Sequence, residues 1–335
     1  MRVHVFEFIC GGGLAGLPLP AALAREADLM LTALVGDLLQ LPGLQVSYAR
    51  DARLPPPADA RLRAARVCWR QPDVAASDAL AREIAAADAT WPIAPETGGA
   101  LERAAQAVLD AGRVLLGPRP HAIGLAASKF ATSQRLARAG IDTVPCFRAG
   151  SAWTGSDGPW VVKPDDGAGC VDTRRVGGCE QAAAALGERA GLIAQPWIAG
   201  EAMSLCVLAT RAGVDVLSVN RQHLRLDDDG AIGLAAVDVN CEPVAAPLAA
   251  MADSVAAAIP GLHGYFGIDF VHTTAGPVVI EVNPRLTSSY AGLGPALGLN
   301  PAASVLAAAT GRPPLPKRPR RGRTIRLRLN GHETG

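Results

Sequence analysis

The segment from Gly264 to Arg285 reads GYFGIDFVHTTAGPVVIEVNPR. It contains two runs rich in β-branched and aromatic residues, 265–272 and 278–282, which are separated by the polar stretch 273–277. Two such runs joined by a short polar stretch are typical of a β-hairpin. This hairpin guides the interpretation of the whole chain, because it combines a strand pattern with charged residues inside the strands.

Three oxygen-bearing side chains are predicted to share one face of the hairpin. Residues two apart on a strand point to the same side, so Glu281 and Asn283 lie together, and Asp269 on the partner strand can lie opposite them. Two carboxylates and an amide oxygen suit Mg²⁺, which takes its other ligands from water and nucleotide phosphates. The alternative is an edge hairpin that turns polar residues to solvent. It is less favoured, because a carboxylate inside an apolar strand is costly unless it is paired or coordinated.

The composition is that of an ordinary globular chain. Its 335 residues are enough for two or three domains, and a net charge of +1 gives no argument for a nucleic-acid or membrane partner. The seven cysteines include no Cys-x-x-Cys pair, so they predict neither a zinc site nor a disulfide framework. The N-terminus lacks a signal-peptide pattern, and no apolar run reaches about 18 residues, so we expect a cytoplasmic protein.

The first 120 residues alternate between strand-like and helix-like patterns. This alternation predicts a parallel, doubly wound α/β sheet. The glycine turn at 11–13 follows the first strand, yet Pro18 and Pro20 interrupt the helix that a dinucleotide-binding motif requires. We therefore interpret the glycines as residues that let the backbone come close to a ligand or to another loop. We do not predict an NAD site here.

A pattern that suits phosphate binding follows. Lys129 starts a predicted helix, a short strand is predicted over 144–148, and Lys163 ends an apolar strand. The turn after that strand contains Gly167 and Gly169, which allow backbone N–H groups to close around phosphate oxygens. The pattern is not a P-loop, since Gly-x-x-x-x-Gly-Lys-Ser/Thr is absent.

The second half of the chain consists largely of antiparallel strand patterns with one long helix. After residue 311 the sequence is Pro-rich and basic, and it then alternates over 324–329 as an edge strand would. A nucleic-acid patch is the alternative for this tail. We predict an α/β fold that is α+β in its second half. Its domains are an N-terminal α/β domain (1–120), a small subdomain with the phosphate lysines (121–194), a C-terminal subdomain with the metal site (195–311) and a tail (312–335).

In their order and spacing, these residues resemble the ATP-grasp ligases. The resemblance covers roughly residues 120–310, and its most specific part is the hairpin with Asp269, Glu281 and Asn283. It implies an ATP-grasp fold, in which two subdomains grip ATP between them, preceded here by the N-terminal α/β domain.

The resemblance also implies roles for individual residues. Lys129 and Lys163 would contact phosphates together with the loop of Gly167 and Gly169, and Arg285 would join Lys163 at the transferring phosphoryl group. The metal ligands would be Asp269, Glu281 and Asn283, and the adenine-binding hinge would be Gln195, Pro196, Trp197 and Ile198.

Two positions depart from the family pattern. Many members carry Glu where this chain has Gln195, whose amide oxygen can still accept a hydrogen bond from the adenine amino group. The ribose-binding acid commonly lies seven residues farther on, where this chain has Ala202. Glu201 is one residue early and is the candidate for the ribose, although strand alternation would turn it to the other face.

A narrower resemblance involves the N-terminal domain. The segments FEF at 6–8, GGG at 11–13 and APET at 94–97 resemble the ATP-grasp branch that joins glutamate to tyramine in methanofuran biosynthesis. This implies a ligase that activates the γ-carboxylate of L-glutamate as an acyl phosphate and joins it to tyramine or a related aromatic amine. Glu7 and Glu96 would line the acceptor pocket, at the carboxyl ends of the strands. The alternative is that each of them caps or pairs locally.

Two alternatives stay open. One is the same chemistry on another amino-acid pair or cofactor side chain, and the other is a nucleotide-binding protein without ligase activity. We expect ATP and Mg²⁺, or Mn²⁺, as cofactors. The expected partners are small-molecule substrates, with neither nucleic acid nor membrane, and the expected assembly is a homodimer.

Overall fold

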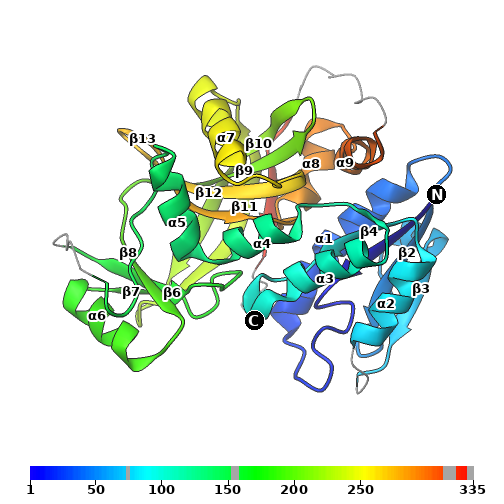
Figure 1. Ribbon diagram of the computed structural model, residues 1–335, viewed down its shortest axis with the longest axis horizontal. Helices are drawn as coiled ribbons and strands as arrows, with labels where there is room; N and C mark the ends of the chain where they lie inside the picture. The colour runs from blue at the N-terminus through cyan, green and yellow to red at the C-terminus, as the bar shows by residue number, and fades with distance from the viewer. Residues whose placement is uncertain (73–75, 152–157, 312–321, 330–335) are drawn as a thin grey trace.

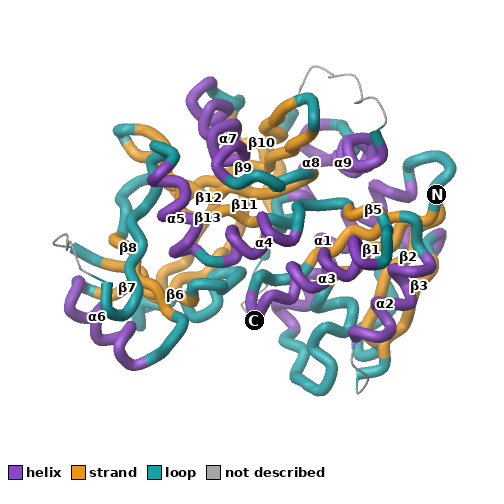
Figure 2. The backbone as a smooth tube through the Cα atoms, viewed as in Figure 1, coloured by secondary structure: helices purple, strands orange, loops and turns teal. Residues whose placement is uncertain are grey.

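A computed structural model describes residues 1–72, 76–151, 158–311 and 322–329. Its strands form three sheets. In Figure 1 the N-terminal sheet (blue to cyan) lies at one end, a small sheet (green) at the other, and the largest sheet (yellow-green to orange) between them. Figure 2 shows helices lying beside the strands of each sheet. Among the described residues, no helix combines the length and the hydrophobicity needed to cross a membrane.

The N-terminal sheet has the strand order β3-β2-β1-β4-β5, and each pair of neighbours is parallel. All five residues of β4 are buried, as expected for a strand covered by helices on both faces. The predicted doubly wound sheet is confirmed. Its elements are β1 (Arg2–Glu7), α1 (Ala21–Leu39), β2 (Gln45–Asp51), β3 (Arg66–Arg70), α2 (Ala76–Ala86), β4 (Ala89–Ile93), α3 (Ala100–Asp110) and β5 (Val114–Leu115).

The small sheet is antiparallel with the order β7-β6-β8. It packs against α6 around a hydrophobic core of its own, which includes Trp160 and Leu186. Ser128 begins α5, because its side chain accepts a hydrogen bond from the N–H of Ala131. The elements of this region are α4 (Pro120–Ala127), α5 (Lys129–Arg138), β6 (Trp160–Pro164), β7 (Arg174–Val176), α6 (Cys179–Glu188) and β8 (Leu192–Pro196).

The prediction of a strand over 144–148 is wrong. This region makes two isolated β-bridges, from Thr143 to Val279 and from Phe147 to Ala194. The first partner belongs to the large sheet and the second to the small sheet. The chain therefore crosses from one sheet to the other and extends neither of them.

The large sheet is antiparallel with the order β13-β12-β9-β10-β11-β14. Strand alternation separates its two faces: Leu205 and Val207 share a core with α7, whereas Cys206 and Leu208 face α8 and α9. Its elements are β9 (Glu201–Thr210), β10 (Gly213–Leu226), β11 (Ile232–Glu242), α7 (Ala246–Ala258), β12 (Gly264–Thr273), β13 (Gly276–Asn283), α8 (Tyr290–Leu297), α9 (Pro301–Thr310) and β14 (Ile325–Arg328).

Helix α1 joins the N-terminal domain to the large sheet. Its Leu31 and Leu34 belong to the same hydrophobic core as Leu293 of α8 and Val305 of α9. The small sheet, in contrast, has a separate core. The N-terminal domain and the large sheet are therefore packed as one unit, beside which the small sheet is a distinct body.

The shared core predicts a strong effect of one leucine in α1. Leu34→Ala should lower the free energy of unfolding by about 2–5 kcal/mol, because it removes buried methyl groups and leaves a cavity. The control is Leu17→Ala, at a side chain that is 58% exposed, which should change this free energy by less than about 0.5 kcal/mol. Urea denaturation followed by circular dichroism measures both. Equal effects of the two substitutions would contradict the packing of α1 described here.

Candidate active site

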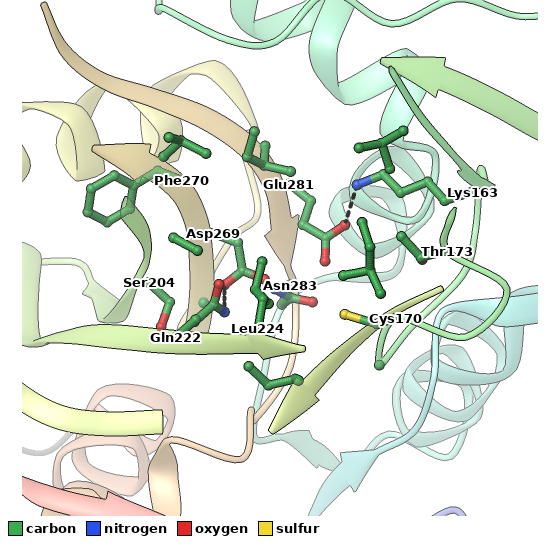
Figure 3. Close-up of a pocket in the computed structure, with 18 of the residues that line it drawn as sticks. Lys163, Cys170, Thr173, Ser204, Gln222, Leu224, Asp269, Phe270, Glu281 and Asn283 are labelled. Atoms are coloured by element: carbon green, nitrogen blue, oxygen red, sulfur yellow. Dashed lines mark hydrogen bonds and ion pairs between the residues drawn. The ribbon is translucent and has the colours of Figure 1, made fainter. Parts of the chain in front are cut away.

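The hairpin of β12 and β13 brings the three predicted metal ligands together. Asp269 lies opposite Glu281 in the strand register, and Gly267 lies opposite Asn283. The side-chain amide of Asn283 donates to the carboxylate of Asp269 over 3.1 Å, and the amide of Gln222 on β10 donates to the same carboxylate over 3.2 Å. Figure 3 shows these side chains converging on one pocket.

Two lysines from different elements meet Glu281 in this pocket. The ammonium of Lys163 on β6 lies 3.4 Å from one Glu281 oxygen (Figure 3), and that of Lys129 on α5 lies 3.5 Å from the same oxygen. Burial opposes ionisation of Glu281, but the two positive charges outweigh it and lower the pKa of this carboxyl to about 2. Burial and the negative charge of Glu281 raise the pKa of Asp269. In the free protein, neighbouring positive charges therefore balance the negative charge of Glu281 well, whereas a negative charge on Asp269 is balanced poorly.

The donor set fits a hard divalent cation. Within the part of the chain that the structure describes, no cluster of three or more His, Cys, Asp or Glu side chains suits a metal ion. The hairpin offers two carboxylates and one amide oxygen instead, and the raised pKa of Asp269 shows that a further positive charge beside it would be favourable. This set suits Mg²⁺, which usually binds one or two carboxylates and keeps oxygen ligands from water and phosphates.

The Gly-rich loop after β6, residues 165–169, forms hydrogen bonds with the start of α5. The carboxylate of Asp165 accepts a hydrogen bond from the N–H of Phe130 over 2.8 Å, and the ammonium of Lys129 donates to the carbonyl oxygen of Gly167. Gly169 has a φ of 64°, in the left-handed region that favours glycine. These contacts bring Gly167 and Gly169 to the wall of the pocket, where both predicted lysines also lie.

The segment that follows β8 forms another wall. Gln195, Pro196, Trp197 and Ile198 all line the pocket. Gln195 is buried, and its Nε2 has no hydrogen-bond partner among the described residues. An unsatisfied buried donor is unfavourable, so a ligand that accepts a hydrogen bond would fit here.

Glu201, the candidate for binding the ribose, is not among the described residues that line the pocket. Its side chain is exposed, and its carboxylate pairs with Arg221 over 3.3 Å. The neighbouring Ala202 lines the pocket instead, since successive residues of a strand point to opposite faces. The assignment of Glu201 to the ribose is therefore not supported by its position.

Arg285 enters the pocket from the end of the hairpin. Its Nε lies 3.0 and 3.1 Å from the two carboxylate oxygens of Glu96, which precedes α3 in the N-terminal domain. Both side chains are largely buried, at 13% and 6% exposure. Glu96, which was predicted to line the acceptor pocket, is not among the described residues that line this pocket. Its ion pair with Arg285 connects two domains.

A further carboxylate, which the sequence analysis did not identify, reaches the pocket from α1. Glu26 lines the pocket and accepts a hydrogen bond from the hydroxyl of Ser288, which follows the hairpin. The available signal was an acid within the apolar stripe of α1, between Leu23 and Ala27. That signal alone does not reveal what the carboxylate faces.

Glu7 has a different position from the one predicted. Its carboxylate is 2% exposed and accepts a hydrogen bond from the N–H of Cys10 over 2.6 Å. Burial has the largest influence and raises the pKa of Glu7 to about 7, against the hydrogen bonds and the charge of Arg285. Glu7 is not among the described residues that line the pocket, so its position does not support a direct contact with an acceptor.

Two family models match this chain. One, an ATP-grasp domain, matches residues 126–289, and the other, a pre ATP-grasp 3 domain, matches residues 44–123. The chain therefore contains an ATP-grasp domain preceded by a pre ATP-grasp domain. ATP-grasp enzymes are ATP-dependent ligases that form carbon–nitrogen bonds, and they bind ATP together with divalent metal ions. The predicted fold class is confirmed, and the predicted enzyme class is that of the superfamily.

Individual ATP-grasp proteins resemble the chain to different extents. The tyramine–L-glutamate ligase of Methanocaldococcus jannaschii is 32% identical over 99 residues, a stretch that spans 30% of this chain and only 30% of that protein. An ATP-grasp superfamily structure from Archaeoglobus fulgidus matches with a TM-score of 0.71 at 20% identity, over 98% of this chain and 92% of that chain. The L-amino acid ligase from Bacillus licheniformis matches with a TM-score of 0.65 at 18% identity, over 94% of this chain and 74% of that chain. At such identities the two structures show the shared fold.

The pKa of Glu7 predicts a pH dependence of stability. Its ordinary value is 4.5 and its value in the folded chain is about 7, so the folded chain binds more protons between these pH values. The stability contributed by the neutral carboxyl is therefore fully present below about pH 4.5 and is lost as the pH rises through about 7. Glu7→Gln should remove this dependence and raise the free energy of unfolding at pH 8 by about 1–3 kcal/mol.

Urea denaturation at pH 5 and pH 8 tests this expectation. Glu180→Gln is the control, since Glu180 is exposed in the first turn of α6. If Glu7→Gln retains the pH dependence of the native chain, this result would contradict the conclusion that Glu7 is buried as an uncharged carboxyl.

Proposed function

We propose that this chain is an ATP-dependent ligase that converts a carboxylate into an acyl phosphate and joins it to an amine. The observation that carries the proposal is the meeting of Lys129 and Lys163 with Glu281 in the pocket. Lys163 belongs to the small sheet and Glu281 to the large sheet. Lys129 belongs to α5, whose Leu136 shares a core with the large sheet. A nucleotide bound between them would touch both halves of the ATP-grasp fold.

The residues of the chain supply what nucleotide phosphates require. Lys129 and Lys163 provide positive charge, and the backbone around Gly167 and Gly169 provides N–H donors. In the free protein both lysines pair with the single carboxylate of Glu281. ATP would bring negative charges that take over this role and leave Glu281 available to a metal ion.

The remaining binding roles follow from the lining of the pocket. Asp269, Glu281 and Asn283 would hold Mg²⁺, or Mn²⁺ in its place, and a bound divalent ion neutralises phosphate oxygens. The hinge of residues 195–198 would hold the adenine, with the unpaired amide group of Gln195 as a hydrogen-bond donor.

The proposed reaction has two steps. A carboxylate oxygen of the acid attacks the γ-phosphorus of ATP, and ADP leaves. The amine then attacks the acyl carbon, phosphate leaves, and the nitrogen loses a proton. Lys163 and Arg285 would neutralise the transferring phosphoryl group, so the protein contributes mainly positioning and charge.

For the substrates, we propose the γ-carboxylate of L-glutamate and tyramine or a related aromatic amine, in methanofuran-type cofactor biosynthesis. The support is the 32% identity with tyramine–L-glutamate ligase over 99 residues. Glu26 and Arg285 add one negative and one positive group to the pocket, which suits an amine and a carboxylate. A ligase for another amino-acid pair is the second candidate, favoured by the fold shared with L-amino acid ligase. The cytoplasmic location and the homodimer remain predictions from the sequence.

Removing the charge of Glu281 tests the catalytic assignment. Glu281→Gln should retain nucleotide binding, because both lysines remain, and should lower turnover at least about 100-fold, because one metal ligand is lost. Isothermal titration with ADP and a phosphate-release assay measure the two properties. Glu180→Gln makes the same chemical change at an exposed site and should leave both unchanged. Turnover that survives in Glu281→Gln would show that the metal assignment is wrong.

Substrate dependence tests the narrow proposal. Phosphate release from ATP and Mg²⁺ should require L-glutamate and tyramine together, and mass spectrometry should find a product with one amide bond between them. Release with other amino-acid pairs and not with tyramine would favour the second candidate. No release across a panel of acids and amines, with ATP bound, would favour a nucleotide-binding protein without ligase activity.

A further inference from the structure

A turn of the N-terminal domain contacts the Gly-rich loop. The turn is Thr97–Gly99, directly before α3. The hydroxyl of Thr97 donates to the backbone carbonyl of Asp166 over 2.9 Å, and the N–H of Gly98 donates to the carboxylate of Asp166 over 2.9 Å. Gly98 and Gly99 have φ values of 60° and 71°, so the shape of the turn depends on glycine. The N-terminal domain thereby holds the loop that bounds the phosphate side of the pocket.

The residue before this turn is held by the other half of the molecule. Glu96 accepts both hydrogen bonds from the Nε of Arg285, at 3.0 and 3.1 Å. This ion pair is largely buried. The stretch 96–98 therefore contacts Arg285 of the large-sheet region and Asp166 of the Gly-rich loop at the same time.

The loop is held at two neighbouring residues that differ in exposure. Asp165 is fixed to α5, where it accepts the N–H of Phe130 and its carboxylate is 16% exposed. Asp166 is held by Thr97 and Gly98, which are both exposed to solvent. A hydrogen bond that water can reach is readily exchanged for one to water, so its net contribution is small. The loop is therefore firmly fixed at one residue and reversibly attached at the next.

We propose that Asp166 is a positioning residue whose contact with the turn Thr97–Gly99 holds the Gly-rich loop closed over the nucleotide phosphates, and that this contact breaks when ADP leaves. The inference rests on the proposed function, because ADP is the product that the loop retains. Glu96 keeps its own largely buried ion pair with Arg285, so the arginine stays in place when the exposed contact of the turn with Asp166 breaks.

Three variants separate the hydrogen bond from the charge. Asp166→Ala removes both the acceptor and the charge, whereas Asp166→Asn keeps an acceptor oxygen and removes only the charge. Asp229→Ala is the matched control. Asp229 is an exposed carboxylate that also accepts a backbone N–H, from Ala231, and it pairs with Arg174. Neither Asp229 nor Arg174 is among the described residues that line the pocket.

Release of a fluorescent nucleotide reports directly on the loop. In stopped-flow measurements, Asp166→Ala should release N-methylanthraniloyl-ADP roughly five-fold faster than the native chain, the effect expected from losing one exposed hydrogen bond. The KM for ATP should rise by a similar factor, while kcat should change by less than about two-fold. Asp166→Asn and Asp229→Ala should release the nucleotide at nearly the native rate.

Unchanged release from Asp166→Ala would overturn the proposal, and so would equal acceleration by Asp166→Asn, which would assign the effect to charge. If Asp166→Ala does not give the native circular dichroism spectrum, Thr97→Val replaces it, because this substitution removes the other donor to the loop and carries the same expectation. A native chain that binds no ADP analogue would overturn the proposed function and this inference together. A native chain that binds the analogue without ligase turnover would overturn the ligase function alone, since nucleotide release still tests the loop.

Discussion

The ion pairs of Glu281 with Lys129 and Lys163 are the interaction on which the rest of the site depends. Buried charges are tolerated when opposite charges lie close to them, and the loss of one partner leaves the others unbalanced. Each member of this group comes from a different element, β13, α5 and β6. The large sheet fixes the carboxylate, and α5, which packs on the same sheet through Leu136, fixes the ammonium of Lys129. The small sheet fixes the ammonium of Lys163. The relative position of the two halves is thus coupled to charge balance in the pocket.

The charges of the pocket also explain why a nucleotide and a metal ion belong together here. The lining contains three carboxylates, of Glu26, Asp269 and Glu281, and three cationic side chains, of Lys129, Lys163 and Arg285. The two sets are equal in number, but burial and the charge of Glu281 raise the pKa of Asp269, so a negative charge on Asp269 is the least well balanced. In the proposed function, a nucleotide that engages the lysines would displace Glu281 from them, so the two carboxylates of the hairpin would then need a new positive partner. A divalent ion bound to the phosphates would meet this need without any rearrangement of the fold.

The sequence predicted those parts of the site that depend on local spacing. Strand alternation places Glu281 correctly on the hairpin, and the position of Lys163 follows from a strand that ends in a Gly-rich turn. The ion pair of Glu96 with Arg285 joins residues 189 positions apart and depends on domain packing, which no local pattern contains. For the same reason the local pattern predicts a strand over 144–148, although this part of the chain contacts two sheets. The parallel N-terminal sheet was predictable from alternating elements, whereas α4, α8 and α9 are apolar on most sides and lack a helical periodicity.

The core that α1 shares with α8 and α9 has a consequence for how such chains diversify. A domain with its own core can be exchanged between relatives as a module, whereas the N-terminal domain here is joined to the large sheet through buried leucines. Its α1 also carries Glu26 into the pocket. A recombination point at residue 120 would therefore separate a helix from the surface that buries it and from the site that it helps to form. Changes of substrate preference in this architecture are more accessible to point substitutions on α1 than to the shuffling of whole domains.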